Sequence, residues 1–180
     1  MHGRQATRAL AVEAGHLACA YAVGSGVEIE TRLWWNGPWQ LQLHKYRLQN
    51  PYRLLLGGQS LAAEEESELA ASGKFPRLAW CNRTHHAVLQ AVHGFESSAL
   101  RQVTRGKNPR THICAVNSLT PYLQTATIEG EGWLAALHGI GPVSADLADW
   151  EMSASGAGAW TLRSNGAANW IIRHPSLPAV

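Results

Sequence analysis

The chain has 180 residues, of which 46% are hydrophobic and 16% are charged, and its formal charge at pH 7 is +2. This length and composition are typical of one folded domain with a sizeable core, and they exclude a disordered chain. The small net charge and the lack of Lys and Arg runs argue against a nucleic-acid partner and against an anionic membrane.

Three consecutive antiparallel strands are predicted near the N-terminus. Apolar residues alternate with their neighbours over residues 17–23, 27–35 and 39–43, which is the period of a strand with one buried face. Gly24-Ser25-Gly26 separates the first two segments, and Asn36-Gly37-Pro38 separates the second and third. Both are turn sequences that favour hairpins.

Short strands are expected in most of the remaining chain, with glycine-rich turns such as Gly130-Glu131-Gly132 between them. They are residues 52–56, 86–93, 111–116, 123–128, 133–138, 160–163 and 169–173. Residues 61–72 (LAAEEESELAAS) differ, because their composition and spacing suit either a short helix or an exposed acidic insertion. The sequence therefore predicts a single all-β domain over 1–180, an antiparallel β-sandwich or stacked sheets, with at most one short helix near 61–72.

A polar cluster, His44-Lys45-Tyr46-Arg47, follows the third strand. Apolar residues are odd-numbered up to Leu43 and even-numbered afterwards, and such a change of parity indicates either a β-bulge or the end of the strand. The candidate catalytic residues are His44, Tyr46 and Arg47, since a histidine base beside cations suits proton abstraction next to a uronate carboxylate. Side chains alternate between the two faces of a strand, however, so His44 can act with Tyr46, or Lys45 with Arg47, but not all four together.

Eight tryptophans are many for a chain of this length. Exposed aromatic rings serve sugar-binding modules as stacking platforms, whereas buried ones fill the space between sheets. Trp39, Trp133 and Trp160 are in phase with apolar neighbours and are expected in the core. Trp34 is in phase with Glu30 and Arg32, which makes it the candidate for an exposed sugar platform.

No metal site or cofactor is predicted. His85 and His86 are adjacent and would point to opposite faces of a strand, and His93 differs in parity from His86. The three cysteines lie far apart and form no CxxC pair, as expected of reduced, buried residues. With no apolar run of about 18 residues and no signal-type segment, the expectations are a cytoplasmic protein and no membrane partner.

A resemblance to domain-of-unknown-function family 2264, a bacterial and fungal family, extends over residues 5–140. The motifs that resemble its C-terminal β domain keep the family's order and spacing. They are Gly37-Pro38-Trp39 with Leu41, Leu43, His44 and Arg47, then Gly57-Gly58, Pro109-Arg110-Thr111-His112-Ile113, Pro121, Leu123, Gly130, and Gly132-Trp133-Leu134-Ala135. Leu56 replaces a glutamate of the family, and Arg110 and His112 stand where it has asparagines.

The resemblance implies a larger parent protein, in which an α/α toroid like those of polysaccharide lyases and glycosidases precedes a β domain. In heparinase-like toroid enzymes the β domain can supply a histidine to the shared cleft, which points to His44 by analogy. Arg110 and His112 join Trp34 as candidate binding residues. The predicted function is an accessory β domain in carbohydrate processing, catalytically silent alone, with a toroid and a poly- or oligosaccharide as partners. The alternative is a free-standing carbohydrate-binding module, and a self-sufficient enzyme is the third reading.

Overall fold

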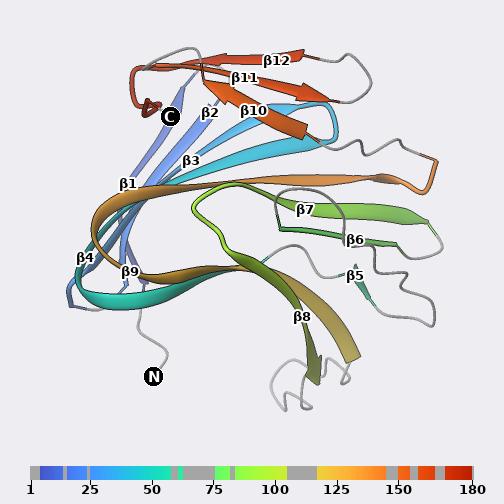
Figure 1. The fold of residues 1–180 in the computed structure, drawn as a ribbon, viewed down its shortest axis with the longest axis horizontal. Coiled ribbons are helices and arrows are strands. Elements are labelled where there is room, and N and C mark those ends of the chain that lie inside the picture. Colours follow the sequence, from blue (N-terminus) through green and yellow to red (C-terminus); the bar gives the residue numbers. More distant parts are fainter. Residues whose placement is uncertain are drawn as a thin grey trace. The chain divides into compact units, whose positions relative to one another are not determined.

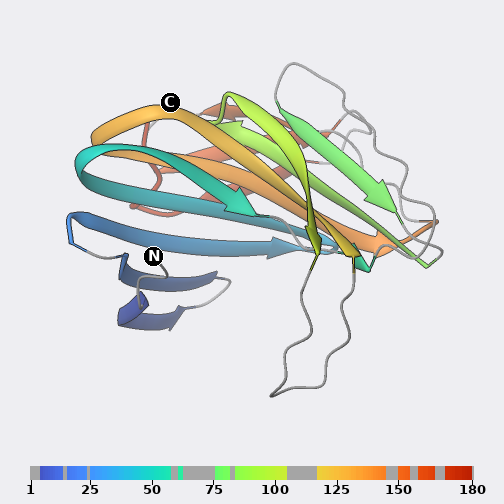
Figure 2. The same cartoon turned by 90° about the horizontal axis from the view of Figure 1, so that it is seen from below.

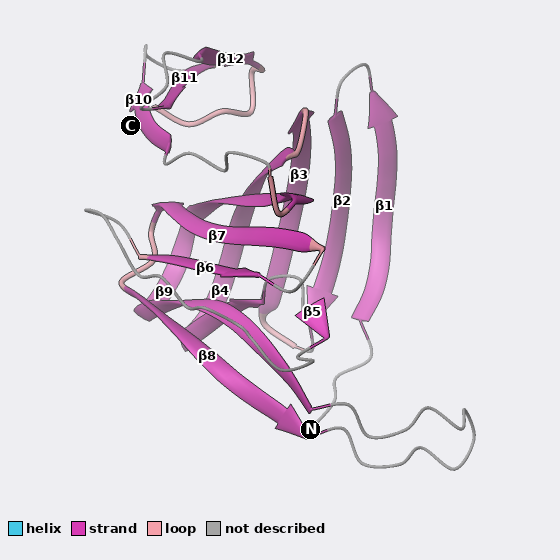
Figure 3. Cartoon of the chain, turned by 90° about the vertical axis from the view of Figure 1, so that its right-hand side faces the viewer, coloured by secondary structure: helices cyan, strands magenta, loops and turns pink. Residues whose placement is uncertain are grey.

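The computed structural model describes residues 5–13, 16–23, 25–57, 61–62, 76–81, 84–104, 117–144, 150–154, 158–164 and 169–179. These residues form strands joined by turns, and they contain no helix (Figure 3). All the strand pairs are antiparallel. The predicted all-β class, with antiparallel sheets, is confirmed.

Twelve strands are formed by the described residues. They are β1 (Gln5–Glu13), β2 (His16–Val23), β3 (Val27–Asn36), β4 (Trp39–Gly57), β5 (Leu61–Ala62), β6 (Arg77–Cys81), β7 (His85–His93), β8 (Ser97–Thr104), β9 (Asn117–Pro142), β10 (Trp150–Ala154), β11 (Ala159–Ser164) and β12 (Asn169–Arg173). Leu61 and Ala62, where the helical alternative begins, form β5 and pair with Leu119 and Ser118 of β9. Residues 63–72 and the strand expected at 111–116 lie outside the described residues.

Two compact units divide the chain, Met1–Ala145 and Asp146–Val180. The first contains a nine-stranded sheet with the order β1-β2-β3-β4-β9-β7-β6, to which β5 and β8 are added by pairing with β9. The second contains a three-stranded sheet with the order β10-β11-β12. The expectation that residues 1–180 act together as one β domain stays a prediction.

The predicted hairpins of β2, β3 and β4 are confirmed. Tyr21 pairs with Ile29 and Asn36 pairs with Trp39, so Gly37 and Pro38 form a two-residue turn. The φ of Gly37 is +57°, in the region that glycine occupies without steric cost, which explains a glycine at this turn.

In the first unit the two longest strands, β4 and β9, curve strongly, so the sheet folds back over itself (Figures 1 and 2). The start of β4, residues 39–48, pairs without interruption with residues 139–130 of β9. The register then shifts, and Tyr52–Gly57 pairs with residues 128–122. The turn expected at Gly130-Glu131-Gly132 is therefore wrong, because Gly130, at φ +72°, lies within the continuous strand β9.

The bend divides the sheet into two layers. The large layer holds β1, β2, β3, the start of β4, the end of β9, β7 and β6, and the small layer holds the end of β4, β5, the start of β9 and β8. A buried cluster unites Leu89 and Leu134 of the large layer with Leu123 of the small layer and with Phe95, and Leu54 packs against it. Burial of a leucine stabilises a fold by about 1.5–3 kcal/mol, so this cluster holds the two layers together.

The second unit carries three buried tryptophans, one on each strand: Trp150, Trp160 and Trp170. The rings of Trp150 and Trp170 meet edge to face with centroids 6.4 Å apart, which is a favourable aromatic geometry. The Trp160 indole N–H donates to the carbonyl of Pro178 at 3.0 Å. Trp160 thereby links the central strand of the small sheet to the segment that follows β12.

Candidate functional site

His44 lies inside the folded sheet of the first unit. The residue is 9% exposed, and its Nδ1 is 2.8 Å from the hydroxyl oxygen of Thr31, its cross-strand partner on β3. Among the described residues, the buried Nε2 of His44 has no hydrogen-bond partner. Burial, with a smaller effect of the charge on His138, lowers the pKa of His44 to about 4. The imidazole is therefore neutral at physiological pH.

Both predicted explanations of the change of parity at His44, a β-bulge and the end of the strand, are wrong, because β4 continues through His44 to Gly57. Residues 39–48 keep an unbroken register with both neighbouring strands. The parity of the apolar residues changes because the buried face changes: Leu41 and Leu43 are buried on one face, and His44 and Leu48 on the other. The bend encloses the second face, so a regular strand can bury opposite parities at its two ends.

Tyr46 shares a face of β4 with His44, as the alternation of side chains requires. Its ring lies over Gly132, where an added Cβ would collide with the phenol. Burial raises the pKa of Tyr46. His44 and Tyr46 together line a small hollow of about 90 Å³ with Ile29, Leu54 and other apolar residues. The structure thus brings these two candidates together, in apolar surroundings.

Arg47 points to the opposite face of β4, beside acidic groups. Its Nε donates to a carboxylate oxygen of Glu131 at 2.7 Å, and its Nη1 is 3.7 Å from Glu28. Lys45 lies on this face and helps to line a hollow of about 280 Å³ with Arg47, Glu131 and Glu28. The arginine is therefore paired with the chain's own carboxylates and does not share a site with His44.

Trp34 is not the exposed ring that the sequence predicts. It is 7% exposed and stacks on His16 with ring centroids 5.4 Å apart. Trp35, which the alternation placed in the apolar stripe, is 50% exposed. Trp39 and Trp160 are buried as expected, and Trp133 is half-buried against His93, with ring centroids 3.6 Å apart.

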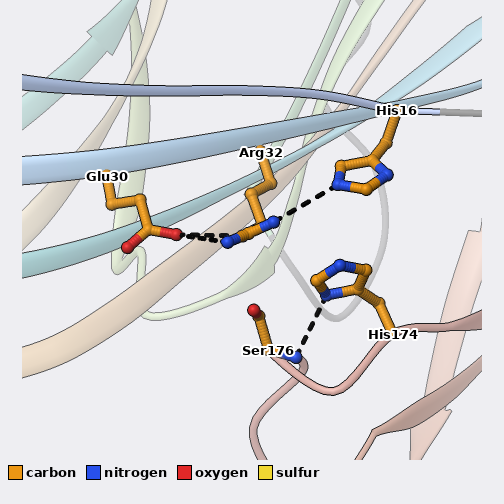
Figure 4. Close-up of polar contacts among 5 residues, drawn as sticks. All are labelled: His16, Glu30, Arg32, His174 and Ser176. Atoms are coloured by element: carbon orange, nitrogen blue, oxygen red, sulfur yellow. Dashed lines mark hydrogen bonds and ion pairs between the residues drawn. The ribbon is translucent and has the colours of Figure 1, made fainter. Parts of the chain in front are cut away.

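A partly buried row of polar side chains accompanies Trp34 on its face of β3. Arg32 donates from Nε to a carboxylate oxygen of Glu30 at 2.9 Å, and its Nη1 is 3.3 Å from Nε2 of His16 (Figure 4). A guanidinium can only donate, so Nε2 of His16 is the acceptor in this contact. In the second unit, the backbone N–H of Ser176 donates to Nδ1 of His174 at 3.0 Å (Figure 4).

A third hollow, of about 260 Å³, lies beside the β3–β4 turn, and we call it the Trp35 hollow. Trp35, Gln40 and His138 line it, together with Trp39 and Gly139. Trp35 pairs with Gln40, and Gln40 pairs with His138, so the three side chains form a row on one face of β3, β4 and β9. Burial lowers the pKa of His138 to about 4, and its buried Nε2 has no partner among the described residues. The alternation of apolar residues does not single out Trp35 or His138, because it does not tell which face of the sheet remains accessible to solvent.

The candidate binding residues Arg110 and His112 lie outside the described residues, so their roles stay predictions. In the described ranges, no three His, Cys, Asp or Glu side chains converge in a way that could hold a metal ion. No helix long and apolar enough to cross a membrane occurs in those ranges either.

Comparison with known proteins gives a likeness of fold. No family model matches the chain, and no curated protein matches its sequence. Among solved structures, heparan sulfate lyase HepC from Pedobacter heparinus aligns with a TM-score of 0.68 and 11% identity, over 95% of this chain and 28% of the lyase. A heparinase III gene product aligns with a TM-score of 0.62 and 11% identity, over 94% of this chain and 28% of the other.

A further heparinase III structure aligns with a TM-score of 0.59 and 9% identity, over 94% of this chain and 27% of that one. The chain thus spans little more than a quarter of each of these larger proteins. The resemblance to family 2264 stays a prediction, since no family model matches. At 9–11% identity these alignments show that the chain has the fold of a β portion of heparinase structures.

Proposed function

We propose that this chain is an accessory β domain of a polysaccharide-processing protein and is catalytically silent by itself. The observation that carries the proposal is the alignment of nearly the whole chain with about 28% of a heparan sulfate lyase. A β domain of this kind would act beside a larger helical domain or chain, as the resemblance to family 2264 implies. A shared fold at 11% sequence identity does not establish a shared substrate. The class of polymer that the protein processes is therefore part of the proposal.

Catalytic silence is supported by the positions of the candidate groups. A general base works best with a pKa near the working pH, whereas the pKa of His44 is about 4 and its ring is buried. Tyr46 has a raised pKa, and Arg47 is paired with carboxylates on the opposite face. His44 and Arg47 therefore suit structural roles, and a complete lyase site would need groups from a partner.

The test is an elimination assay on the isolated chain. Heparan sulfate and a panel of other uronate polymers are incubated with the protein, and the ultraviolet absorbance of the unsaturated uronate product is followed. We expect no product from the chain alone. Product formation that disappears in His44→Ala, while the fold is retained, would overturn catalytic silence and restore His44 as a base.

A second function, a free-standing carbohydrate-binding module, is favoured by the exposure of Trp35 beside a hollow. Sugar binding in such modules depends on an accessible aromatic ring. Isothermal titration of the isolated chain with soluble oligosaccharides distinguishes the two functions. A binding module holds sugars without any partner, whereas a purely accessory domain shows no heat of binding.

A further inference from the structure

The Trp35 hollow differs in charge from the hollow beside Arg47. Among the residues that the structure describes, no Asp, Glu, Lys or Arg lines the Trp35 hollow, and His138 is neutral near pH 7 because burial lowers its pKa to about 4. The hollow beside Arg47, by contrast, is lined by three glutamates and two cations. A site for sulfated or uronate sugars needs cations to bind the anion, so the Trp35 hollow suits an uncharged ligand.

The row Trp35–Gln40–His138 offers the groups that an uncharged sugar uses. Cross-strand neighbours have Cβ atoms about 5 Å apart, so the row extends over about 10 Å. The exposed Trp35 ring provides an apolar platform at one end. Drug-sized ligands occupy roughly 300–1,000 Å³, and a hollow of about 260 Å³ suits a smaller ligand such as one sugar ring.

One polar member of this row, Gln40, has hydrogen-bonding capacity left over. The Gln40 side-chain oxygen accepts from the Gln42 amide at 2.6 Å, which orients the Gln40 amide and leaves its N–H groups as donors. His138 is a lining residue of the hollow, and burial of its Nε2 away from solvent leaves the Gln40 amide as the polar group that a ligand can reach.

We propose that the Trp35 hollow is a subsite for an uncharged pyranose, with the sugar face stacked on Trp35 and the hydroxyls bonded to the Gln40 amide. The inference rests on the proposed carbohydrate role and narrows it to a neutral sugar unit, either a neutral polymer or an uncharged residue within a mixed one. Trp39 shapes the hollow from the other face of β4, because its ring lies against Gly139.

The experiment measures binding of cellohexaose, chitohexaose and heparan sulfate oligosaccharides to the whole chain by isothermal titration. The variants are Trp35→Ala, Trp35→Phe and Gln40→Ala, and Leu55→Ala is the matched control, since Leu55 is 59% exposed and does not line this hollow. The chain has eight tryptophans, so its fluorescence does not report on Trp35 alone. Two-dimensional NMR resolves the indole N–H groups and therefore follows the signal of Trp35 directly.

We expect a neutral oligosaccharide to bind with little dependence on salt and to shift the Trp35 indole signal. Trp35→Ala should weaken binding at least about tenfold, Trp35→Phe should retain part of it, and Leu55→Ala should leave it unchanged. Binding of heparan sulfate that survives Trp35→Ala and weakens with salt would overturn the subsite and leave the carbohydrate role standing. If no saccharide binds, both the subsite and the binding-module function fail, whereas the accessory role stands, because a purely accessory domain shows no heat of binding.

Discussion

The imidazole Nδ1 of His44 and the hydroxyl oxygen of Thr31 lie 2.8 Å apart, across the pairing of β4 with β3. The sequence predicts His44 as a candidate catalytic base, but this contact makes it part of the hydrogen bonding inside the sheet. The two side chains come from the strands of one hairpin, and their shared face is enclosed by the bend of the sheet.

His44→Ala should destabilise the protein. The substitution leaves the Thr31 hydroxyl without its side-chain partner and opens a cavity, which together cost about 1–3 kcal/mol of the free energy of unfolding. Lys45→Ala, at the exposed next position, should change it by less than about 0.5 kcal/mol. Urea unfolding followed by circular dichroism compares the two variants. An unchanged midpoint for His44→Ala would contradict the buried position of this ring.

The stability of the chain should fall as the pH is lowered from about 6.5 to 4. Burial lowers the pKa of His44 and of His138 to about 4 in the folded state, whereas an unfolded histidine titrates near about 6.5. The unfolded state therefore binds more protons in this range, so acid favours unfolding. Each imidazole contributes on the order of 3 kcal/mol or less.

Denaturant titrations at a series of pH values measure this loss of stability, and NMR titration of the two imidazoles identifies its source. The urea-unfolded chain serves as the reference state. If both rings titrate near 6.5 in the folded protein, the burial of the pair is refuted.

Gly139→Ala should disturb the Trp39 ring. An added Cβ at Gly139 would lie 2.8 Å from Cζ3 of Trp39, closer than side-chain atoms approach each other. The ring must move in a packed environment, at a cost of about 1–3 kcal/mol in unfolding free energy. Gly57→Ala is the control, because nothing lies within 4 Å of its added Cβ. Thermal unfolding of both variants gives the comparison, and equal melting temperatures would argue against this close contact.

Removal of the Arg47–Glu131 ion pair should matter little. Its two side chains are 64% and 68% exposed, and ion pairs at the surface contribute about 0–1 kcal/mol. A double-mutant cycle of Arg47→Ala and Glu131→Ala, measured at low and high salt, should give a small coupling energy that salt reduces further. A coupling of several kcal/mol, independent of salt, would show that the pair is shielded from water.

Much of the fold follows from alternation and turn chemistry. The segments at 17–23, 27–35 and 39–43 are strands because their apolar residues repeat with a period of two and their connections contain glycine. The strong curvature of β4 and β9 could not be predicted from alternation and turn residues. Gly130-Glu131-Gly132 has the composition of a turn, yet residues 46–48 of β4 pair with all three of these residues, so the hydrogen bonding to β4 keeps the strand whole.

The candidate site was predicted in part. Alternation correctly places His44 with Tyr46 and separates both from Arg47. It could not tell which face the bend would enclose, since enclosure depends on residues 122–128, distant in sequence. The sequence likewise predicts an exposed Trp34 and an apolar stripe with Trp35, whereas Trp34 is buried and Trp35 is exposed. The period of two shows only that the two rings point to opposite faces, and long-range packing decides which face is buried.

The continuity of β4 and β9 through both layers has a consequence for how the first unit folds. Residue 39 pairs with residue 139 in one layer, and residue 57 pairs with residue 122 in the other, so each layer forms only after a long loop has closed. Loop closure of this length makes folding slow compared with proteins built from local contacts. The two layers share both of these strands and the buried cluster of Leu89, Leu134 and Leu123. Amide hydrogens of the two layers should therefore exchange together, as one cooperative unit.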